Sequence, residues 1–265
     1  MAETRRALVT GSSDGIGAAI ADELTRRGMQ VVRHARNERR AAQCREHAGA
    51  NVPVVVGDLA SLASTRALAA QISDLGRLDV IVHNAGWLSP DQARSVTEDG
   101  MERTFQINAV GPYLLTAAVP LPRRFVYVSS DSIRSAHLDL SDLQHESSWE
   151  PMQAYADSKL ALTALALYVA RRYPDVPCNA VHPGWVRSKM SGDVAPLSLE
   201  QGADTPVWLA CADDPGARVT GQLFHDRRPV IYNDEAHDPA IQVALVAALE
   251  ELTGARLPEP SREVT

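Results

Sequence analysis

Short runs rich in β-branched residues alternate with longer amphipathic stretches along most of this 265-residue chain. The runs have the length and composition of strands, and the stretches repeat their apolar residues with the period of a helix. Strands are expected at 7–10, 30–33, 52–56, 79–83, 124–129, 177–181 and 222–225. Helices are expected near 15–28, 38–48, 61–74, 98–118, 152–173 and 200–212. This alternation predicts an α/β fold in which helices cover both faces of a parallel sheet of about seven strands.

The chain contains no internal repeat or linker that would divide it, so a single domain is expected. The alternating pattern occupies residues 1–238. Residues 239–265 add one short helix and then a polar tail, which is expected to be disordered.

Charge and cysteine content exclude several classes of function. The formal net charge of -7 argues against a nucleic-acid partner, which requires a basic surface. The three cysteines (Cys44, Cys178 and Cys211) lie far apart and lack the paired spacing of a metal site. We expect them to be reduced and mostly buried, so no metal is predicted. No leader-like apolar segment is seen at the start, and no apolar stretch is long enough to cross a bilayer. These features predict a cytoplasmic protein without membrane contact.

The first expected strand runs into Thr10-Gly11-Ser12-Ser13-Asp14-Gly15-Ile16-Gly17 and then into a helix. Glycine lets the backbone approach a phosphate closely, and the start of a helix offers free N–H groups and a positive dipole end. Three glycines after a strand are weak evidence by themselves. Their position at the head of an alternating chain favours a pyrophosphate site made by Gly11, Ser13, Asp14, Gly15, Ile16 and Gly17.

Tyr155 and Lys159 lie four residues apart in an expected helix, so both side chains share one face. The 26 basic residues include only two lysines, Lys159 and Lys189, and a position that keeps lysine can need its compact ammonium. A nearby ammonium favours the phenolate and would bring the tyrosine pKa toward neutral pH. The pair is thus a candidate proton donor and acceptor, and an ordinary helix-surface pair is the alternative.

Taken together, these motifs and several others resemble the short-chain dehydrogenase/reductase family, over about residues 5 to 226. The glycine segment matches its T-G-x-x-x-G-x-G pattern. Further matches, in the order of the family, are Asp58-Leu59 after the third strand, Asn84-Ala85-Gly86 after the fourth, Asn108, Ser130, Tyr155-Ala156-Asp157-Ser158-Lys159, and Pro183-Gly184-Trp185-Val186-Arg187-Ser188. His83 stands where the family has the first asparagine of N-N-A-G. Singly, each residue also has a structural explanation, such as a helix cap for Asp58.

The resemblance implies a Rossmann-type doubly wound sheet in which residues 1–238 bind a dinucleotide and carry out catalysis. It implies a catalytic set of Asn108, Ser130, Tyr155 and Lys159. Tyr155 would exchange a proton with the substrate oxygen, Ser130 would donate a hydrogen bond to it, and Lys159 would also hold the nicotinamide ribose. Asn108 would bind a water that links Lys159 to solvent. The remaining cofactor contacts would come from Asp58, Leu59, Asn84, Ala85, Gly86, Pro183, Gly184, Val186 and Ser188.

The end of the second strand bears on the choice of cofactor. Relatives that use NAD carry an acidic residue there, whereas this chain has Ala35 followed by Arg36. Arg36 can pair with the 2′-phosphate of NADP(H) in a charge-assisted fork. Asp14 argues mildly against that choice, and Arg36 can also be an ordinary surface residue. NADP(H) is therefore favoured, and NAD(H) stays open.

The segment 131–154, between Ser130 and Tyr155, is longer than the family usually has. It resembles the retinol-dehydrogenase-like and protochlorophyllide-reductase-like branch. Substrate contacts are expected from Trp87, Trp149, Trp185 and Met190, which suit a mid-sized apolar or aromatic alcohol or ketone. Trp208 is expected in the core instead. The composition, heavy in arginine and alanine, favours a GC-rich bacterial genome, in which such enzymes often act on secondary metabolites.

The expected helix that contains Asn108 is cut short by Pro120 and Pro122. In many relatives this helix forms a four-helix contact between subunits, so a short one favours a monomer or homodimer over the usual tetramer. The alternative function is a regulator that binds the cofactor without chemistry, although such proteins commonly lose the tyrosine or lysine. An epimerase or dehydratase of the extended branch does not fit the glycine pattern.

Overall fold

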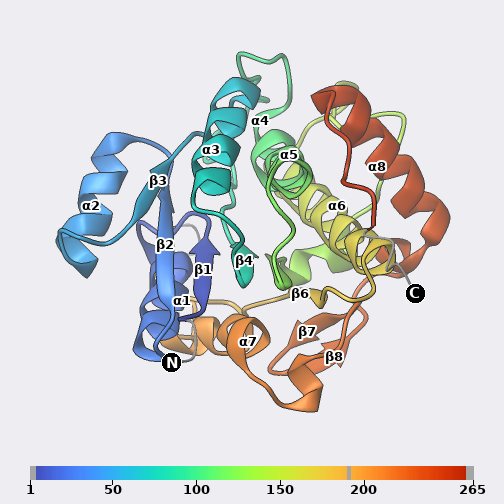
Figure 1. The fold of residues 1–265 in the computed structure, drawn as a ribbon. Coiled ribbons are helices and arrows are strands. Elements are labelled where there is room, and N and C mark those ends of the chain that lie inside the picture. Colours follow the sequence, from blue (N-terminus) through green and yellow to red (C-terminus); the bar gives the residue numbers. More distant parts are fainter. Residues whose placement is uncertain (1–3, 190–191, 261–265) are drawn as a thin grey trace.

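The computed structural model describes residues 4–189 and 192–260, and these form an eight-stranded sheet with the order β3-β2-β1-β4-β5-β6-β7-β8 (Figure 1). The strands are β1 (Arg6–Val9), β2 (Gln30–Ala35), β3 (Val54–Val56), β4 (Val80–His83), β5 (Arg124–Val128), β6 (Cys178–Val181), β7 (Leu223–His225) and β8 (Arg228–Val230). The first seven are parallel, which confirms the predicted Rossmann-type α/β sheet.

The eighth strand was not predicted, and it pairs with β7 in the antiparallel direction at the edge of the sheet. The turn before it holds Asp226 and Arg227 with φ values of 48° and 57°. A left-handed pair without glycine or asparagine is an uncommon hairpin turn. Pro229 also removes one N–H donor, which strands tolerate only at an edge. Neither this turn nor Pro229 is typical of a strand hairpin, so the sequence pattern did not reveal β8.

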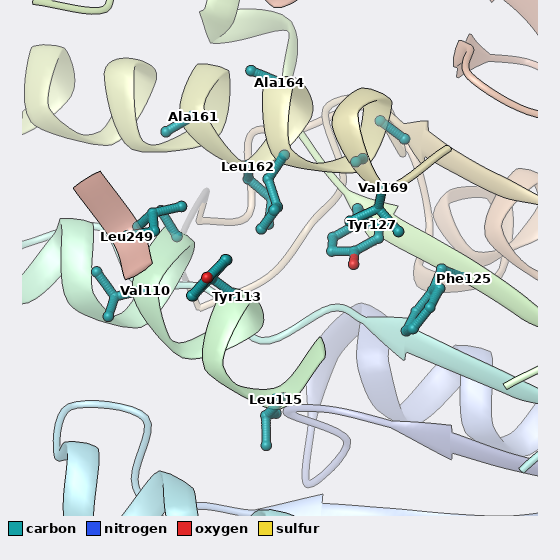
Figure 2. Close-up of a cluster of buried hydrophobic side chains, with 14 of the residues drawn as sticks. Val110, Tyr113, Leu115, Phe125, Tyr127, Ala161, Leu162, Ala164, Val169 and Leu249 are labelled. Carbon is teal, nitrogen blue, oxygen red and sulfur yellow. The ribbon is translucent and has the colours of Figure 1, made fainter. Parts of the chain in front are cut away.

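Helices cover both faces of the sheet. They are α1 (Gly15–Arg26), α2 (Glu38–Ala48), α3 (Leu62–Asp74), α4 (Arg103–Phe105), α5 (Gly111–Ala118), α6 (Pro151–Arg172), α7 (Leu199–Cys211) and α8 (Pro239–Thr253). One core cluster joins α1 and α7 to one face, and the larger cluster joins α3, α5 and α6 to the other. Figure 2 shows part of the larger cluster, where Tyr113 of α5 and Leu162 of α6 lie near Tyr127 of β5, while Leu115 points away from them on the other side of α5.

Two sequence predictions about the core are confirmed. The side chain of Trp208 is buried against Phe224, and its indole N–H donates to Asp214 over 2.8 Å. All three cysteines are free and buried. Burial raises the pKa of the Cys178 thiol well above its usual value, in keeping with a structural role.

The helix expected near 98–118 is not one continuous helix. Gly100 adopts φ 79° in a turn, Glu102 caps the one-turn α4, and a π-helical segment (Gln106–Val110) precedes α5. Apolar periodicity continues through all three pieces, so the pattern alone could not separate them. The end of α5 at Ala118, two residues before Pro120, agrees with the predicted short helix.

The last helix lies over the helix that carries Tyr155 and Lys159. Leu249 of α8 belongs to the same buried cluster as Val110 and Ala161, and Figure 2 shows the three near one another. Beyond α8, the hydroxyl of Tyr113 donates to the Ala255 carbonyl over 2.8 Å, and the hydroxyl of Tyr173 donates to the Pro258 carbonyl over 2.6 Å. The residues up to 260 thus follow the fold, whereas the tail expected to be disordered lies outside the described residues.

Among the described residues, no helix combines the length and apolar character that a membrane crossing would need.

Three histidines are buried in or beside the sheet, and burial lowers the pKa of each. The pKa of His83 falls to about 3, that of His182 to about 4, and that of His34 also falls. Below pH ~6.5 these imidazoles become protonated in the unfolded chain, whereas in the folded chain they stay neutral until the pH nears their lowered pKa values. Their contribution to stability is therefore complete above that pH, and it is lost as the pH falls toward the folded values.

We expect the free energy of unfolding to fall by roughly 3 kcal/mol between about pH 7 and pH 4 through His83 alone. Urea titrations across this range measure the slope. His83→Phe keeps an aromatic ring between Phe125 and Tyr127 but does not titrate, so it should flatten the acid limb. An acid limb that is unchanged in this variant would contradict the assignment.

Candidate active site

The strand order reverses between β1 and β4, and the carboxyl ends of these two strands are joined by side-chain hydrogen bonds. The Thr10 hydroxyl accepts from the Asn84 and Ala85 amides over 2.9 and 3.0 Å, and the Asn84 Nδ2 donates to the Thr10 carbonyl over 2.9 Å. In open α/β sheets, ligands bind in the crevice at this point of reversal. Thr10 thus holds the ends of β1 and β4 together. It was not among the predicted site residues, although it is the first residue of the glycine motif.

The glycine loop passes close to the end of β4. Gly11 has φ 64° and Gly15 has φ 60°, conformations that glycine adopts without strain. A Cβ on Gly17 would lie 2.4 Å from the Asn84 Nδ2 and 2.4 Å from the Gly11 carbonyl oxygen. Gly15 begins α1, so the dipole of a twelve-residue helix points its positive end at this turn. The loop therefore has the geometry and the electrostatics of a phosphate site.

Asp14 precedes α1 and has an extended backbone, but its carboxylate faces outward instead of capping the helix. It accepts from Lys189 over 2.6 Å and from Arg40 over 2.9 Å. Burial alone would raise the pKa of Asp14, but the Lys189 hydrogen bond and the Arg40 charge outweigh burial and lower it. The carboxylate thus gathers two cations at the rim of the loop, which reduces its repulsion of an anionic ligand.

The ends of β2 and β3 lie beside the glycine loop. Arg36 is exposed directly after the buried Ala35. The Asp58 carboxylate accepts from the Ala60 amide over 3.0 Å, and Leu59 is buried. Arg40, which pairs with Asp14, belongs to the same basic cluster as Arg36 and was not predicted to contribute. The sequence feature that could have indicated a role for Arg40 is its position four residues after Arg36 in the same basic cluster.

Tyr155 and Lys159 project from α6 toward the end of β5. The Lys159 ammonium donates to the Val128 carbonyl over 2.9 Å and lies 5.8 Å from the centre of the Tyr155 ring. A Cβ on Gly86 would lie 3.1 Å from the Lys159 Nζ and 3.6 Å from the Asn108 Oδ1. Gly86, in the loop after β4, therefore lies against the side chains of Lys159 and Asn108. Three separate sequence motifs thus converge on one point.

Asn108 is fully buried in the π-helical segment, a form that is rare and frequent at functional sites. Its Oδ1 accepts from the Trp87 amide over 2.7 Å, and its Nδ2 donates to the Trp87 carbonyl and to the Ser158 hydroxyl, both over 2.9 Å. The side chain thus fastens the loop after Gly86 to α6. The predicted water-mediated link to Lys159 stays a prediction.

Ser130 follows β5 and caps the short 3-10 helix (Asp131–Ser135), where its hydroxyl oxygen accepts from the Ser132 amide over 3.2 Å. The same hydroxyl forms a hydrogen bond with the Tyr155 phenol, which lowers the pKa of that phenol. The adjacent Ser129 bonds Thr163 in the interior instead, over 2.7 Å. Of the two serines at this strand end, Ser130 is therefore the one that faces Tyr155.

The predicted acidification of Tyr155 is not found. Burial raises the pKa of Tyr155 to about 12, and the Ser130 hydrogen bond only partly opposes this shift. Burial also lowers the pKa of Lys159 to about 8. Helical spacing indicated that the two groups share a face, but it carried no information about desolvation, which dominates both groups.

The segment after β6 approaches the same region. Gly184 has φ 87°, and a Cβ there would lie 2.3 Å from a Leu197 methyl group. Val186 is buried and forms a bridge with Leu197, and Ser188 forms a bridge with Gly192. Pro183 lies two residues beyond the end of β6. The segment thus folds back on itself, and Lys189 at its far end reaches Asp14.

The candidate substrate residues are not gathered at one point. The Trp149 indole N–H donates to Glu102 over 3.3 Å, and Trp185 is 55% exposed. Trp87 is half-buried in the loop fastened by Asn108. Met190 lies outside the described residues. Residues of the insert line a cavity of about 120 Å³ together with Phe105 and Asp157, and no tryptophan is among the lining residues.

The comparisons with known proteins agree with this geometry. A family model described as short chain dehydrogenase matches residues 5–197. Short-chain dehydrogenase chry4 of Gibberella zeae is 34% identical, over 96% of this chain and 99% of its own length. The "Putative daunorubicin C-13 ketoreductase DnrU" of Streptomyces sp. (strain C5) is 33% identical, over 97% and 94%. Retinol dehydrogenase 14 of Mus musculus is 31% identical, over 93% and 85%, in agreement with the predicted branch.

Two solved structures show the same fold. An uncharacterized protein from Mycobacterium Paratuberculosis has a TM-score of 0.81 and 30% identity, over 96% of this chain and 95% of that chain. A blue fluorescent protein from a metagenomic library, in complex with NADPH, has a TM-score of 0.64 and 26% identity, over 83% and 95%. The relatives come from a fungus, a Streptomyces and a mammal, so a bacterial origin stays a prediction.

The family model, the full-length relatives and the shared fold lead to one conclusion. The chain belongs to the short-chain dehydrogenase/reductase family and is an NAD(P)-dependent oxidoreductase.

Proposed function

We propose that the protein interconverts a ketone or aldehyde and an alcohol with NADP(H), and that Tyr155 is the acid and base. The observation that carries the proposal is the convergence of Tyr155, Lys159, Ser130 and Asn108 beside Gly86, at the reversal point of the sheet. The glycine loop fits a dinucleotide, because two left-handed glycines and the start of α1 direct amides toward a phosphate.

When bound, the nicotinamide supplies or accepts the hydride. Tyr155 transfers a proton to the carbonyl oxygen in reduction and takes it back in oxidation. Its pKa of about 12 keeps the phenol protonated at neutral pH, which suits donation to a carbonyl. Ser130 donates to the same oxygen as negative charge develops, and Lys159 places a cation near the phenol. The side chain of Asn108 holds the loop that lies against Lys159.

The preference for NADP(H) rests on two arginines and on Ala35 standing at the end of β2 in place of an acidic residue. Arg36 is exposed directly after Ala35, and the Arg40 guanidinium donates a hydrogen bond to Asp14 of the glycine loop. A 2′-phosphate would gain charge-assisted hydrogen bonds from both guanidinium groups. The NADPH bound to one structural relative supports this choice.

The double variant Arg36→Ala, Arg40→Ala should weaken NADPH binding by about 100-fold or more, since each of the two lost ionic contacts is worth roughly 1.5–3 kcal/mol. Binding of NADH, which has no 2′-phosphate, should weaken far less, because Lys189 still pairs with the Asp14 carboxylate beside the pyrophosphate site. Fluorescence titration of the reduced nicotinamide measures both affinities. Arg39→Ala is the matched control from the same exposed cluster. Equal losses for the two dinucleotides would refute the assignment of the arginines.

For the substrate we propose a mid-sized apolar or aromatic carbonyl compound of the kind found in secondary metabolism. The exposed Trp185 and the half-buried Trp87 lie on the two loops that flank the convergence point and offer aromatic surface. The name of the Streptomyces relative, a ketoreductase, supports this class.

A panel of aliphatic, aromatic and polycyclic ketones and aldehydes, followed by the consumption of NADPH or NADH, tests the function. We expect turnover with NADPH and at least one aromatic or polycyclic ketone. Tight NADPH binding without turnover of any carbonyl or alcohol would instead indicate a catalytically silent cofactor-binding regulator.

We also propose that the protein is a monomer or homodimer in a reducing compartment such as the cytoplasm. In support, α8 and the segment after it lie on α5 and α6, which limits the surface these helices offer to other subunits. The three free cysteines suit a reducing compartment. Light scattering in solution measures the subunit number.

A further inference from the structure

His34 is an interior side chain of β2 to which the proposed chemistry assigns no role. It is 2% exposed and lies between Arg33 and Ala35 behind the glycine loop. Its Nδ1 accepts from the Gly11 amide over 2.9 Å. Its Nε2 lies 2.8 Å from the Gly57 carbonyl oxygen. One ring thus connects the glycine loop to the turn that leads into Asp58.

The two contacts fix the protonation of the ring. Since Nδ1 accepts from an amide, the proton must lie on Nε2, where it donates to the Gly57 carbonyl. Burial lowers the pKa of His34, in keeping with a neutral ring, and the only charged side chain that raises this pKa among the described residues is Asp58. The His34 backbone adds two contacts to the loop: its amide donates to the Ser12 hydroxyl over 3.0 Å, and its carbonyl accepts from the Ser12 amide over 3.1 Å.

We infer that His34 is a positioning residue for the dinucleotide, which holds the glycine loop and the turn before Asp58 in the arrangement that binds it. The inference rests on the proposed function. The two segments that His34 joins are the glycine loop, predicted to meet the pyrophosphate, and the turn that leads into Asp58, predicted to be a further cofactor contact. Because its ring lies behind both, His34 affects affinity through the backbone and touches neither the substrate nor the reacting atoms.

Histidine suits this position because it combines an acceptor and a donor on opposite sides of a rigid ring. An apolar side chain would leave the partly buried Gly11 amide and the buried Gly57 carbonyl without these partners, which costs about 1–3 kcal/mol for a buried group. The loop could recover these bonds only by moving. Since Gly11 already has a left-handed φ and a Cβ there would lie 2.9 Å from Ala85, little room exists for such movement.

The experiment compares His34→Leu and His34→Asn with the unmodified protein, using NADPH as the probe. We expect His34→Leu to raise the Kd for NADPH by about 10-fold or more. His34→Asn can still accept from the Gly11 amide through its oxygen but does not reach Gly57, so its Kd should rise by only about threefold. This partial rescue is a result that mere loss of packing would not produce.

Val31→Ala is the matched control, because it removes buried volume from the other end of the same strand. It should lower Tm without changing the Kd for NADPH. The inference is overturned if His34→Leu binds NADPH as tightly as the unmodified protein, or if it is no weaker than His34→Asn. Should His34→Leu not fold, an unchanged Kd in His34→Asn overturns the inference equally. An unmodified protein that binds neither NADPH nor NADH would defeat the proposed function itself, which is a distinct result.

Discussion

Tyr155→Phe is expected to lower kcat by about 10²- to 10⁴-fold while the Kd for NADPH changes by less than about threefold. The variant removes one oxygen from a side chain of α6 and leaves the ring in place, so the fold is retained. The lost hydroxyl is the proposed proton donor, which lies beside Ser130. Without it, the carbonyl oxygen must gain its proton from water while negative charge develops.

Turnover of the best ketone from the substrate panel, at saturating NADPH, measures the effect, and fluorescence titration measures the affinity. Tyr168→Phe is the matched control, because Tyr168 lies on the same helix beside Arg171 and away from Ser130. Near-normal turnover in Tyr155→Phe would remove the basis of the proposed mechanism. A parallel loss in Tyr168→Phe would show that the helix, not the hydroxyl, is responsible.

Gly17→Ala is expected to weaken dinucleotide binding by about 100-fold. The added methyl group would meet the Asn84 Nδ2 and the Gly11 carbonyl oxygen, each at 2.4 Å. A backbone oxygen cannot turn away, so the glycine loop must shift from the end of β4. That shift would also disturb the hydrogen bonds between Asn84 and Thr10.

Gly28→Ala is the control for Gly17→Ala. It tests whether weaker binding comes from this close contact or from the replacement of any glycine in the fold. Gly28 has φ 82° but open space around its Cβ position, at the end of α1 far from the loop. We expect a lower Tm in this variant and an unchanged Kd for NADPH. If Gly17→Ala bound NADPH normally, the packing of the loop on β4 would not be a condition for binding.

The sequence pattern predicted the parallel strands and most helices because burial and local periodicity agree in them. It missed β8, where Pro229 and a left-handed turn without glycine conceal a hairpin. It merged three segments into one helix at 98–118, because apolar residues continue through the π-helical turn. Both errors lie where backbone geometry departs from the side-chain pattern.

Motif order was enough to bring the candidate site residues together, since Gly86 and Ser130 follow the carboxyl ends of the neighbouring parallel strands β4 and β5, and Lys159 of α6 reaches the end of β5. It could not supply the direction of the pKa shift of Tyr155, which depends on desolvation in three dimensions. Motif order also did not predict the ion pair between Arg40 and Asp14 or the hydrogen bond from Trp149 to Glu102. These contacts join segments far apart in the chain, for which local spacing holds no information.

The position of α8 against α6 has a consequence for how the protein is made. A ribosome releases the amino-terminal part of a chain first, and that part can begin to fold while synthesis continues. Here, however, the cover of the Tyr155 helix lies about 80 residues or more after Tyr155 in the chain, and it is secured by the Pro258 carbonyl. The nascent chain therefore exposes an apolar helix until α8 has left the ribosome, and a chain that ends before α8 would leave that helix uncovered.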